Sequence, residues 1–336
     1  MSSAPTAEEI ARDARWLAQA LDPTAGDVRL VAMDRASYRT ASFLDDRLMQ
    51  QPVDAQIFPW PMIENAVSGN LRTDARWIFH IGHVGSTLVS RLLGEIEGVL
   101  SIREPRFIRD LALTPAPIRH RYIAAIPKLM SRTFGAHERA CVKATSFASE
   151  IAPELVPAGE HAFFMYAGPR NYIATILAGE NSIKELRALE PYRTKRLESR
   201  GITLGILRND ADRAAAAWAC EMTTLEAVAE AMADRQVSWA DFDAMLANMP
   251  RELGRAADFF GFLSDKDRIT AIASGPLMRR YSKDATYEYS PNLRQELIEQ
   301  ELRIRGRDID EALAMLTAAS ERSPLLASGL SRAKGT

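Results

Sequence analysis

Short apolar runs alternate with segments of helical spacing along most of the chain, beginning near residue 76. The runs are rich in β-branched and aromatic side chains, as is typical of strands buried on both faces of a parallel sheet. We predict strands at residues 76–81, 99–102, 140–144, 161–167 and 236–242. The alternation of strand and helix predicts a three-layer α/β fold with a central parallel sheet.

The segments between and after these runs have apolar residues at helical spacing. They predict helices at residues 86–96, 117–133, 171–190, 208–234, 250–262 and 291–319. Near the N-terminus, Ile10, Ala14, Leu17 and Leu21 recur with the same spacing and predict a helix over 7–21.

Residues 22–75 mix short strand-like pieces with a proline-rich turn, "FPWPM". We therefore interpret residues 1–75 as an N-terminal cap and 76–320 as the main α/β domain. The last residues, 321–336, lack a clear pattern and predict a flexible tail.

The charge, the apolar runs and the cysteine content of the chain argue against several classes of protein. The formal net charge is −2 in 336 residues, which argues against a protein that binds nucleic acid through a strong basic field. No apolar run approaches the roughly 20 residues that span a bilayer, and the N-terminal region lacks the apolar core of a signal peptide. The absence of such apolar segments predicts a soluble protein with no membrane partner. The two cysteines have no paired spacing, which predicts a reducing, cytoplasmic environment.

The stretch "FHIGHVGSTLVSRLL", residues 79–93, predicts a strand that turns on glycine and continues as a helix. Gly82 and Gly85 permit a tight turn that brings backbone N–H groups close to an anion. Ser86 is expected to cap the helix, and Thr87 offers a second hydroxyl near the positive end of the helix dipole. A standard Walker A loop would also carry a lysine, which is absent here. The alternative is an ordinary glycine turn before a capped helix.

Five segments follow one another in an order that carries more information than any one of them: "FHIGHVGSTLVSRLL", "VLSIREPRFIRDL", "CVKATS", "FFMYAGPRNYIATIL" and "VSWADFDAMLANMPRELGRAADFFGF". Together they resemble the sulfotransferase family that uses 3′-phosphoadenosine 5′-phosphosulfate, over about residues 76–290. The resemblance implies a P-loop NTPase-like fold of the sulfotransferase type. It also implies that the loop made of Gly82, His83, Val84, Gly85, Ser86 and Thr87 holds the phosphosulfate end of the donor.

In that family a lysine or arginine in the loop contacts the oxygen between phosphate and sulfur, and His83 occupies the matching position. Glu104, in "REP", matches the catalytic base of several members and could accept the acceptor's proton. Arg103 and Arg106 flank it, so the alternatives are a surface ion-pair cluster or arginines that hold an acidic acceptor. Lys143 ends a strand at the same edge, where it could reach the donor or the acceptor, or extend into solvent.

The family's second signature binds the 3′-phosphate of the donor through an arginine and a serine. Aligned on the proline of "YAGPRNYIAT", this chain has Ala167 at the arginine and Thr175 at the serine. Arg170 follows three residues after Ala167 and is a candidate replacement, because an arginine–phosphate contact is not easily replaced by other groups. A later basic stretch offers Arg280 and Lys283 as further candidates.

The resemblance predicts transfer of a sulfuryl group to a hydroxyl or amine of a small-molecule, peptide or carbohydrate acceptor. No metal is expected, because His80 and His83 belong to a strand and a tight turn and no other cluster has metal spacing. Two alternatives stay open. One is a phosphotransferase or nucleotide hydrolase in which Asp241 binds Mg²⁺ instead of starting a helix together with Asp243. The other is a non-catalytic module that binds a nucleotide or a protein.

Overall fold

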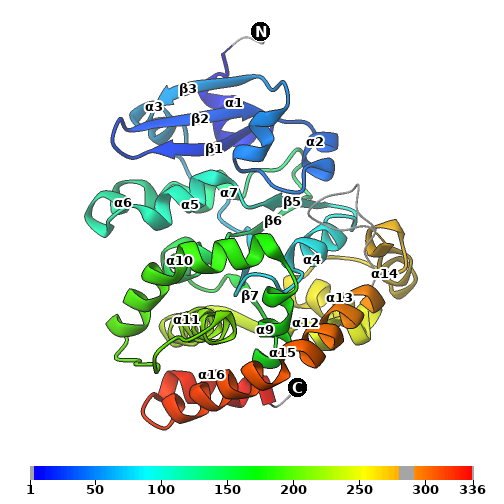
Figure 1. Cartoon of the computed structure of the whole chain (residues 1–336). Coiled ribbons are helices and arrows are strands. Elements are labelled where there is room, and N and C mark those ends of the chain that lie inside the picture. Colours follow the sequence, from blue (N-terminus) through cyan, green and yellow to red (C-terminus); the bar gives the residue numbers. More distant parts are fainter. Residues whose placement is uncertain (1–3, 280–290, 335–336) are drawn as a thin grey trace.

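The protein is described by a computed structural model that covers residues 4–279 and 291–334. Residues 4–75, which we call the cap, form a three-stranded antiparallel sheet in the order β1-β2-β3 with helices around it. The cap lies at one end of the molecule, and the C-terminal helices lie at the other (Figure 1). Its elements are α1 (Ala7–Arg12), β1 (Trp16–Asp22), β2 (Asp27–Ala32), α2 (Arg35–Thr40), η1 (Asp46–Gln50), β3 (Ala55–Pro59) and α3 (Trp60–Ala66).

The helix predicted over residues 7–21 is wrong in its second half. Helix α1 begins at a capping box of Thr6 and Glu9 and ends at Arg12, after which the chain continues as β1. Strand β1 pairs with β2 and packs against the helix that follows β5, so its residues from Trp16 to Leu21 are all buried. Burial from both sides outweighs the helical spacing of the leucines.

The main sheet among the described residues has five parallel strands in the order β5-β6-β4-β7-β8. These strands match the sequence prediction within one residue at each end, and the α/β fold class is confirmed. Strand β4 lies in the middle and is buried along its whole length, with Trp77 opposite Val142 on one side and Ala162 on the other. The strands are β4 (Arg76–His80), β5 (Val99–Arg103), β6 (Arg139–Lys143), β7 (His161–Tyr166) and β8 (Gln236–Asp241).

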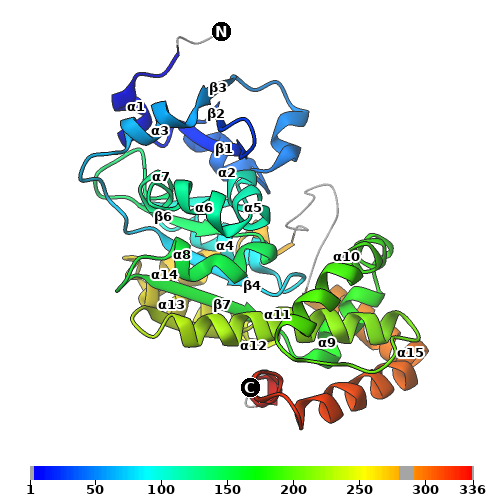
Figure 2. The same ribbon diagram turned by 90° about the vertical axis from the view of Figure 1, so that its left-hand side faces the viewer.

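Helices cover both faces of this sheet. In Figure 2, α5, α6, α8 and α11 lie in front of the strands, and α4, α13 and α14 lie behind them. The first half of the domain contains α4 (Ser86–Leu93), α5 (Arg106–Leu113), α6 (Ala116–Ile123), α7 (Ile126–Met130), η2 (Ser146–Ile151) and α8 (Ala152–Leu155). The second half contains α9 (Pro169–Leu177), α10 (Glu180–Ser199), α11 (Asp210–Ala231), α12 (Phe242–Ala247), α13 (Met249–Phe260), α14 (Lys266–Ala273), η3 (Pro276–Arg279), α15 (Pro291–Ser320) and α16 (Pro324–Lys334). Among the described helices, none is long and apolar enough to cross a membrane.

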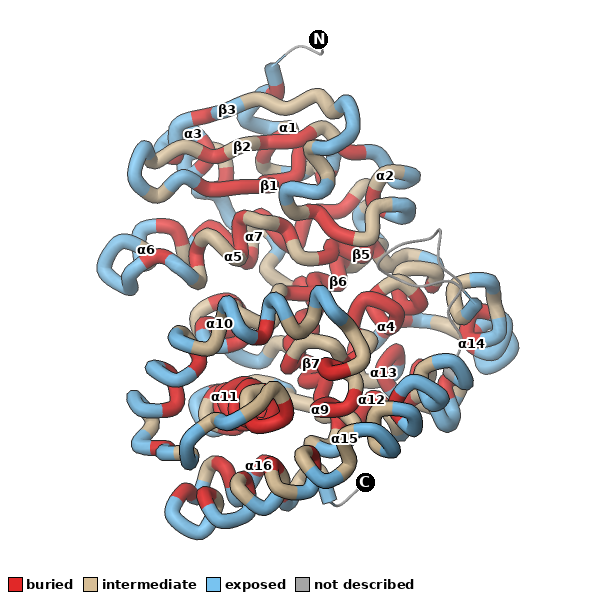
Figure 3. Tube along the Cα trace, in the orientation of Figure 1, coloured by how far each residue is buried: buried red, intermediate tan, exposed pale blue. Residues whose placement is uncertain are grey.

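Helix α11 is the most deeply buried long helix in Figure 3, and it packs against α9, α10, α15 and α16. The last of these is a helix where the sequence predicted a flexible tail. Leu326 is fully buried, and Gly329 lies against Met222 and Trp218 of α11. The apolar positions of this segment are too few to show in the sequence, but α11 provides the surface that they cover.

The direction of the strands determines where functional side chains can come together. Strands β5, β6 and β4 lie side by side in this order and are parallel. They end at Arg103, Lys143 and His80. The residues that follow them therefore meet at one edge of the sheet, where ligands bind in open α/β sheets.

Candidate functional site

The loop between β4 and α4 is strongly curved. Gly82 has φ 77° and Gly85 has φ 60°, both in the left-handed region that favours glycine. Gly85 is the N-cap of α4, in place of the expected Ser86, and no side chain caps the helix. Ser86 and Thr87 are the first helical residues and are buried, and the first N–H groups of α4 have no partner within the helix and no side-chain cap.

His80 holds this loop in place. Its Nδ1 accepts a hydrogen bond from the Gly82 N–H at 2.9 Å, and its Nε2 lies 3.0 Å from the Ala144 carbonyl oxygen. These contacts require the tautomer that carries its proton on Nε2, because only an N–H can donate to a carbonyl. His80 thus connects the loop after β4 to the end of β6. The sequence analysis considered it only as a metal ligand, and only the fold reveals its positioning role.

Glu104 and Lys143 form an ion pair at the edge of the sheet. The two strands bring them together, because β5 and β6 are paired with Arg103 opposite Lys143, and the Glu104 N–H donates to the Lys143 carbonyl at 2.7 Å. Lys143 is almost completely buried, while the Glu104 side chain keeps 16% of its surface exposed. Lys143 therefore directs its charge at a carboxylate and not, as one alternative had it, into solvent.

The loop and the ion pair line the same cavity, which has a volume of about 350 Å³. All the residues predicted for catalysis and for the phosphosulfate end of the donor border it: Gly82, His83, Val84, Gly85, Ser86, Thr87, Glu104 and Lys143. This volume is within the usual range of small-molecule sites. Their individual roles stay predictions, but the fold brings them together.

Two of these residues have an unusual backbone conformation. His83 has φ 52° and Glu104 has φ 50°, and in the described residues they are the non-glycine positions with positive φ. Glu104 also precedes Pro105, and a residue before proline normally prefers an extended backbone. Such conformations are unfavourable and are retained mostly where function requires them. Both residues border the same cavity.

The cavity also contains residues that the sequence analysis did not select. The cap contributes Phe43, Asp45 and Arg47, and two further arginines, Arg109 and Arg193, come from α5 and α10. The Arg47 guanidinium lies 3.4 Å from the centre of the Phe43 ring, and its Nε donates to Asp45 at 2.8 Å. No sequence signal marks these residues, because the cap matches no recognised motif and Arg193 is one of three arginines on α10.

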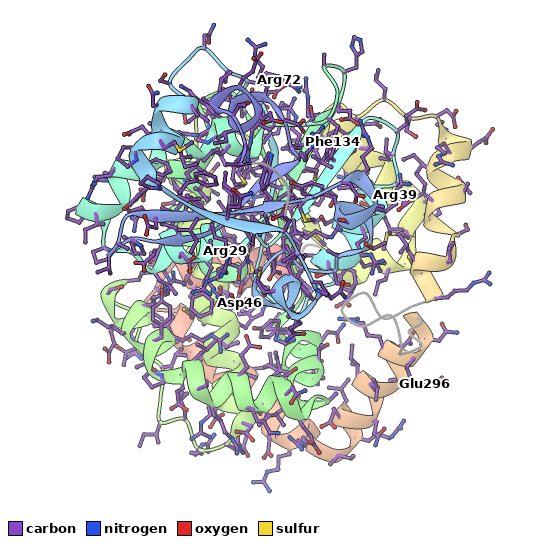
Figure 4. The ribbon with its side chains drawn as sticks, turned by 90° about the horizontal axis from the view of Figure 1, so that it is seen from above. Arg29, Arg39, Asp46, Arg72, Phe134 and Glu296 are labelled. Carbon is purple, nitrogen blue, oxygen red and sulfur yellow. The ribbon has the colours of Figure 1, made fainter. Side chains whose placement is uncertain are left out.

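Arg103 and Arg106, which flank Glu104 in the sequence, lie elsewhere. Arg103 is buried and donates to the carbonyl oxygens of Tyr38 and Ala41 in the cap, and burial lowers the pKa of its guanidinium to about 9. Arg106 donates to Asp46 at 2.6 Å, and Asp46 also accepts from Arg109 at 3.0 Å. Figure 4 shows Asp46 at the edge of the cap next to Arg29, whose Nη2 lies 3.7 Å away. Neither arginine beside Glu104 lines the cavity.

Arg170 and Thr175, two of the residues predicted for the 3′-phosphate, do not border the cavity. Arg170 is half exposed and pairs with Asp310 of α15, and the Thr175 hydroxyl donates to the Asn171 carbonyl of its own helix at 2.7 Å. Ala167 is buried, and its carbonyl accepts from the Trp218 indole at 2.9 Å. Arg280 and Lys283 lie outside the described residues.

Asp241 and Asp243 behave as helix-start carboxylates. Asp241 is the N-cap of α12, where its Oδ1 accepts from the N–H groups of Asp243 and Ala244 at 2.7 and 3.1 Å. Its burial raises the pKa of this carboxyl above its ordinary value. Asp243 accepts from Asn171 and Arg294. Asp241 is not part of the cavity lining.

No protein-family model matches the chain. No curated protein matches it either. Among solved structures, it is similar to a sulfotransferase domain from the curacin biosynthetic pathway, with a TM-score of 0.41 and 12% identity over 71% of this chain and 98% of that one. A sulfotransferase domain from the olefin synthase of Synechococcus PCC 7002 gives 0.37 and 12% identity over 69% and 95% of the two chains. Mouse sulfotransferase SULT7A1, complexed with PAP, gives 0.39 and 11% over 78% and 90%. At these scores the likenesses establish no family for the chain.

Proposed function

We propose that this protein is a sulfotransferase that moves a sulfuryl group from 3′-phosphoadenosine 5′-phosphosulfate to a hydroxyl or amine of an acceptor. The observation that carries the proposal is the shared cavity that joins an anion-binding loop to a carboxylate paired with a buried lysine. A group-transfer enzyme needs both functions at one place: a site for a leaving anion and a base for the attacking group.

The loop suits the phosphosulfate end of the donor. The first turn of α4 presents N–H groups without a side-chain cap, and its helix dipole favours negative charge at that point. The Thr87 and Ser86 hydroxyls lie on the same turn. The His83 ring borders the cavity, with its Nε2 3.9 Å from the Glu185 carboxylate. In the proposed reaction it donates a hydrogen bond to the oxygen between phosphorus and sulfur.

The proposed transfer needs no group other than the donor, the acceptor and these residues. The acceptor oxygen or nitrogen attacks sulfur and forms the new bond, while the bond from sulfur to the phosphate oxygen breaks. The electron pair leaves with the 5′-phosphate of 3′,5′-ADP, where the loop stabilises the charge. Glu104 accepts the acceptor's proton, and Lys143 holds that carboxylate in place through their ion pair.

The 3′-phosphate end of the donor fits less well. Within residues 4–279 and 291–334, neither Arg170 nor Thr175 borders the cavity, and a buried Ala167 replaces the arginine that the family uses. Binding of the donor's adenosine half is therefore tested separately, by comparing 3′,5′-ADP with 5′-AMP, which lacks the 3′-phosphate.

Two alternatives make different predictions. A phosphotransferase or nucleotide hydrolase would use Asp241 for Mg²⁺, but this carboxylate already caps α12 and lies away from the cavity lining. A non-catalytic module would bind a nucleotide or a protein without turnover. The position of Glu104 favours an enzyme, because a module that only binds an anion at the loop gains nothing from a carboxylate at the same cavity.

Binding experiments separate these alternatives. The purified chain is titrated calorimetrically and in thermal unfolding with 3′,5′-ADP, ATP–Mg²⁺ and 5′-AMP, since only ligands that bind the native state raise the unfolding temperature. Selective stabilisation by 3′,5′-ADP supports the proposal, and a preference for ATP–Mg²⁺ contradicts it. Absence of any response favours a protein-interaction module. Mass-spectrometric comparison of cells with and without the protein then identifies sulfated products.

A further inference from the structure

Arg193, on α10, is a buried cation in the wall of the cavity. Its side chain is only 10% exposed, and it borders the same space as the loop and the Glu104–Lys143 pair. Its Nε is buried and has no hydrogen-bond partner among the described residues. A buried guanidinium normally has its donors satisfied, so this unsatisfied one calls for an explanation.

The nearest carboxylate does not satisfy Arg193. Glu221 of α11 lies with its Oε1 3.7 Å from the Arg193 Nε, which is longer than a hydrogen bond, and its Oε2 is likewise buried without a hydrogen bond from the described part of the chain. Burial raises the pKa of Glu221, although Arg193 opposes the shift. The two side chains therefore form a buried ion pair without a hydrogen bond between Arg193 Nε and the carboxylate.

The acidic residues that border the cavity lie beside other side chains. Asp45 pairs with Arg47, Glu104 with Lys143, and Glu185 lies beside His83. The next arginine on α10, Arg196, pairs with Glu150 outside the cavity. Arg193 thus brings to the cavity a positive charge whose nearest counter-charge, Glu221, lies outside the cavity lining.

We propose that Arg193 binds an anionic group of the acceptor, so that the acceptor is a hydroxyl or amino compound that also carries a carboxylate, phosphate or sulfate. This inference rests on the proposed function in assigning the anion to the acceptor. The planar guanidinium suits two parallel hydrogen bonds to such a group. The donor's phosphosulfate faces the α4 terminus, whereas Arg193 projects from α10 and orients the second substrate.

The test compares anionic and neutral ligands of the same shape. A panel of hydroxybenzoates, hydroxyphenylacetates and sugar acids, each paired with its uncharged amide, is titrated by calorimetry into the full-length chain. Each titration is done with and without saturating 3′,5′-ADP. The wild-type protein is expected to prefer at least one acid over its amide, and Arg193→Met is expected to weaken binding of that acid about tenfold or more. Binding of the amide should not change.

Three further variants separate recognition from folding. Arg193→Lys keeps the charge without the planar fork and should retain part of the preference. Arg193→Met combined with Glu221→Gln removes both buried charges, and it should fold while still lacking the preference. Arg187→Met is the matched control, because this α10 arginine is 63% exposed and pairs with Asp210 away from the cavity.

The proposal is wrong if the wild-type chain prefers no acid over its amide, or if Arg193→Met weakens acid and amide equally, as a purely structural pair with Glu221 would. The titrations without 3′,5′-ADP test the role of Arg193 independently of donor binding. A chain that ignores 3′,5′-ADP but keeps an Arg193-dependent preference for acids refutes the sulfotransferase proposal alone. A chain that binds 3′,5′-ADP without that preference refutes the role of Arg193 alone.

Discussion

Gly85→Ala tests the physical basis of the loop most directly. A Cβ at this position would lie 1.9 Å from Cζ and 2.1 Å from Cε2 of the Phe242 ring. Phe242 begins α12 and is almost completely buried, so its ring has little room to move away. Gly85 also has φ 60°, a backbone conformation that any residue other than glycine adopts at a cost.

The expected loss of stability has two parts. The left-handed backbone costs about 1–2 kcal/mol for alanine. Displacing a packed ring typically costs about 1–3 kcal/mol more. We therefore expect a loss of roughly 2–5 kcal/mol. For 336 residues the entropy of unfolding is about 0.7 kcal/mol/K, so the unfolding temperature should fall by about 3–7 °C.

The measurement combines thermal unfolding with calorimetric binding of 3′,5′-ADP. Gly26→Ala is the matched control, because Gly26 has φ 74° and a Cβ there would meet no atom within 4 Å. It should show the backbone cost alone, about 1–2 kcal/mol, and unchanged binding. Gly85→Ala should also weaken binding of 3′,5′-ADP roughly tenfold, because the loop's N–H groups move.

A second substitution tests whether the ring is the cause. Phe242→Leu removes the clashing atoms, so the combination with Gly85→Ala should be less destabilised than the two single changes added together. A coupling energy of about 0.5–3 kcal/mol is typical for residues in contact. The reasoning fails if Gly85→Ala costs no more than Gly26→Ala, or if Phe242→Leu gives no relief.

Three further predictions concern the base, the thiols and the last helix. Glu104→Gln keeps the shape of the side chain but cannot accept a proton, so turnover of an identified acceptor should fall about 100-fold or more while 3′,5′-ADP binding is retained; unchanged turnover would remove Glu104 from this role. Burial raises the pKa of Cys141 and of Cys220 to about 12, so both stay protonated between pH 7 and 9. Neither should react with a thiol reagent such as Ellman's until the chain is denatured, and rapid labelling of the native protein would contradict their burial. Leu326→Ala should cost about 2–5 kcal/mol, measured by denaturant unfolding, because Leu326 is fully buried; a flexible tail would show no change.

The sequence determined the central sheet and the loop. Strands buried on both faces must be continuously apolar, and this local pattern alone located β4 to β8 within a residue at each end. Gly82 and Gly85 marked the turn because a left-handed backbone nearly demands glycine. Because parallel strands direct their ends to one edge, the same strand pattern was enough to place Glu104 and Lys143 near the loop.

Only the tertiary structure decided the rest. The helical spacing from Ile10 to Leu21 was overridden by pairing between β1 and β2, and α16 formed because α11 offers an apolar surface to Leu326. His80 gained its role from a carbonyl 64 positions away along the chain. Arg193 is one of three arginines on α10 until the fold buries it at the cavity, with its counter-ion Glu221 outside the cavity lining and too far for a hydrogen bond. Local patterns report what one segment needs, whereas pairing, burial and charge balance depend on which distant segments lie beside it.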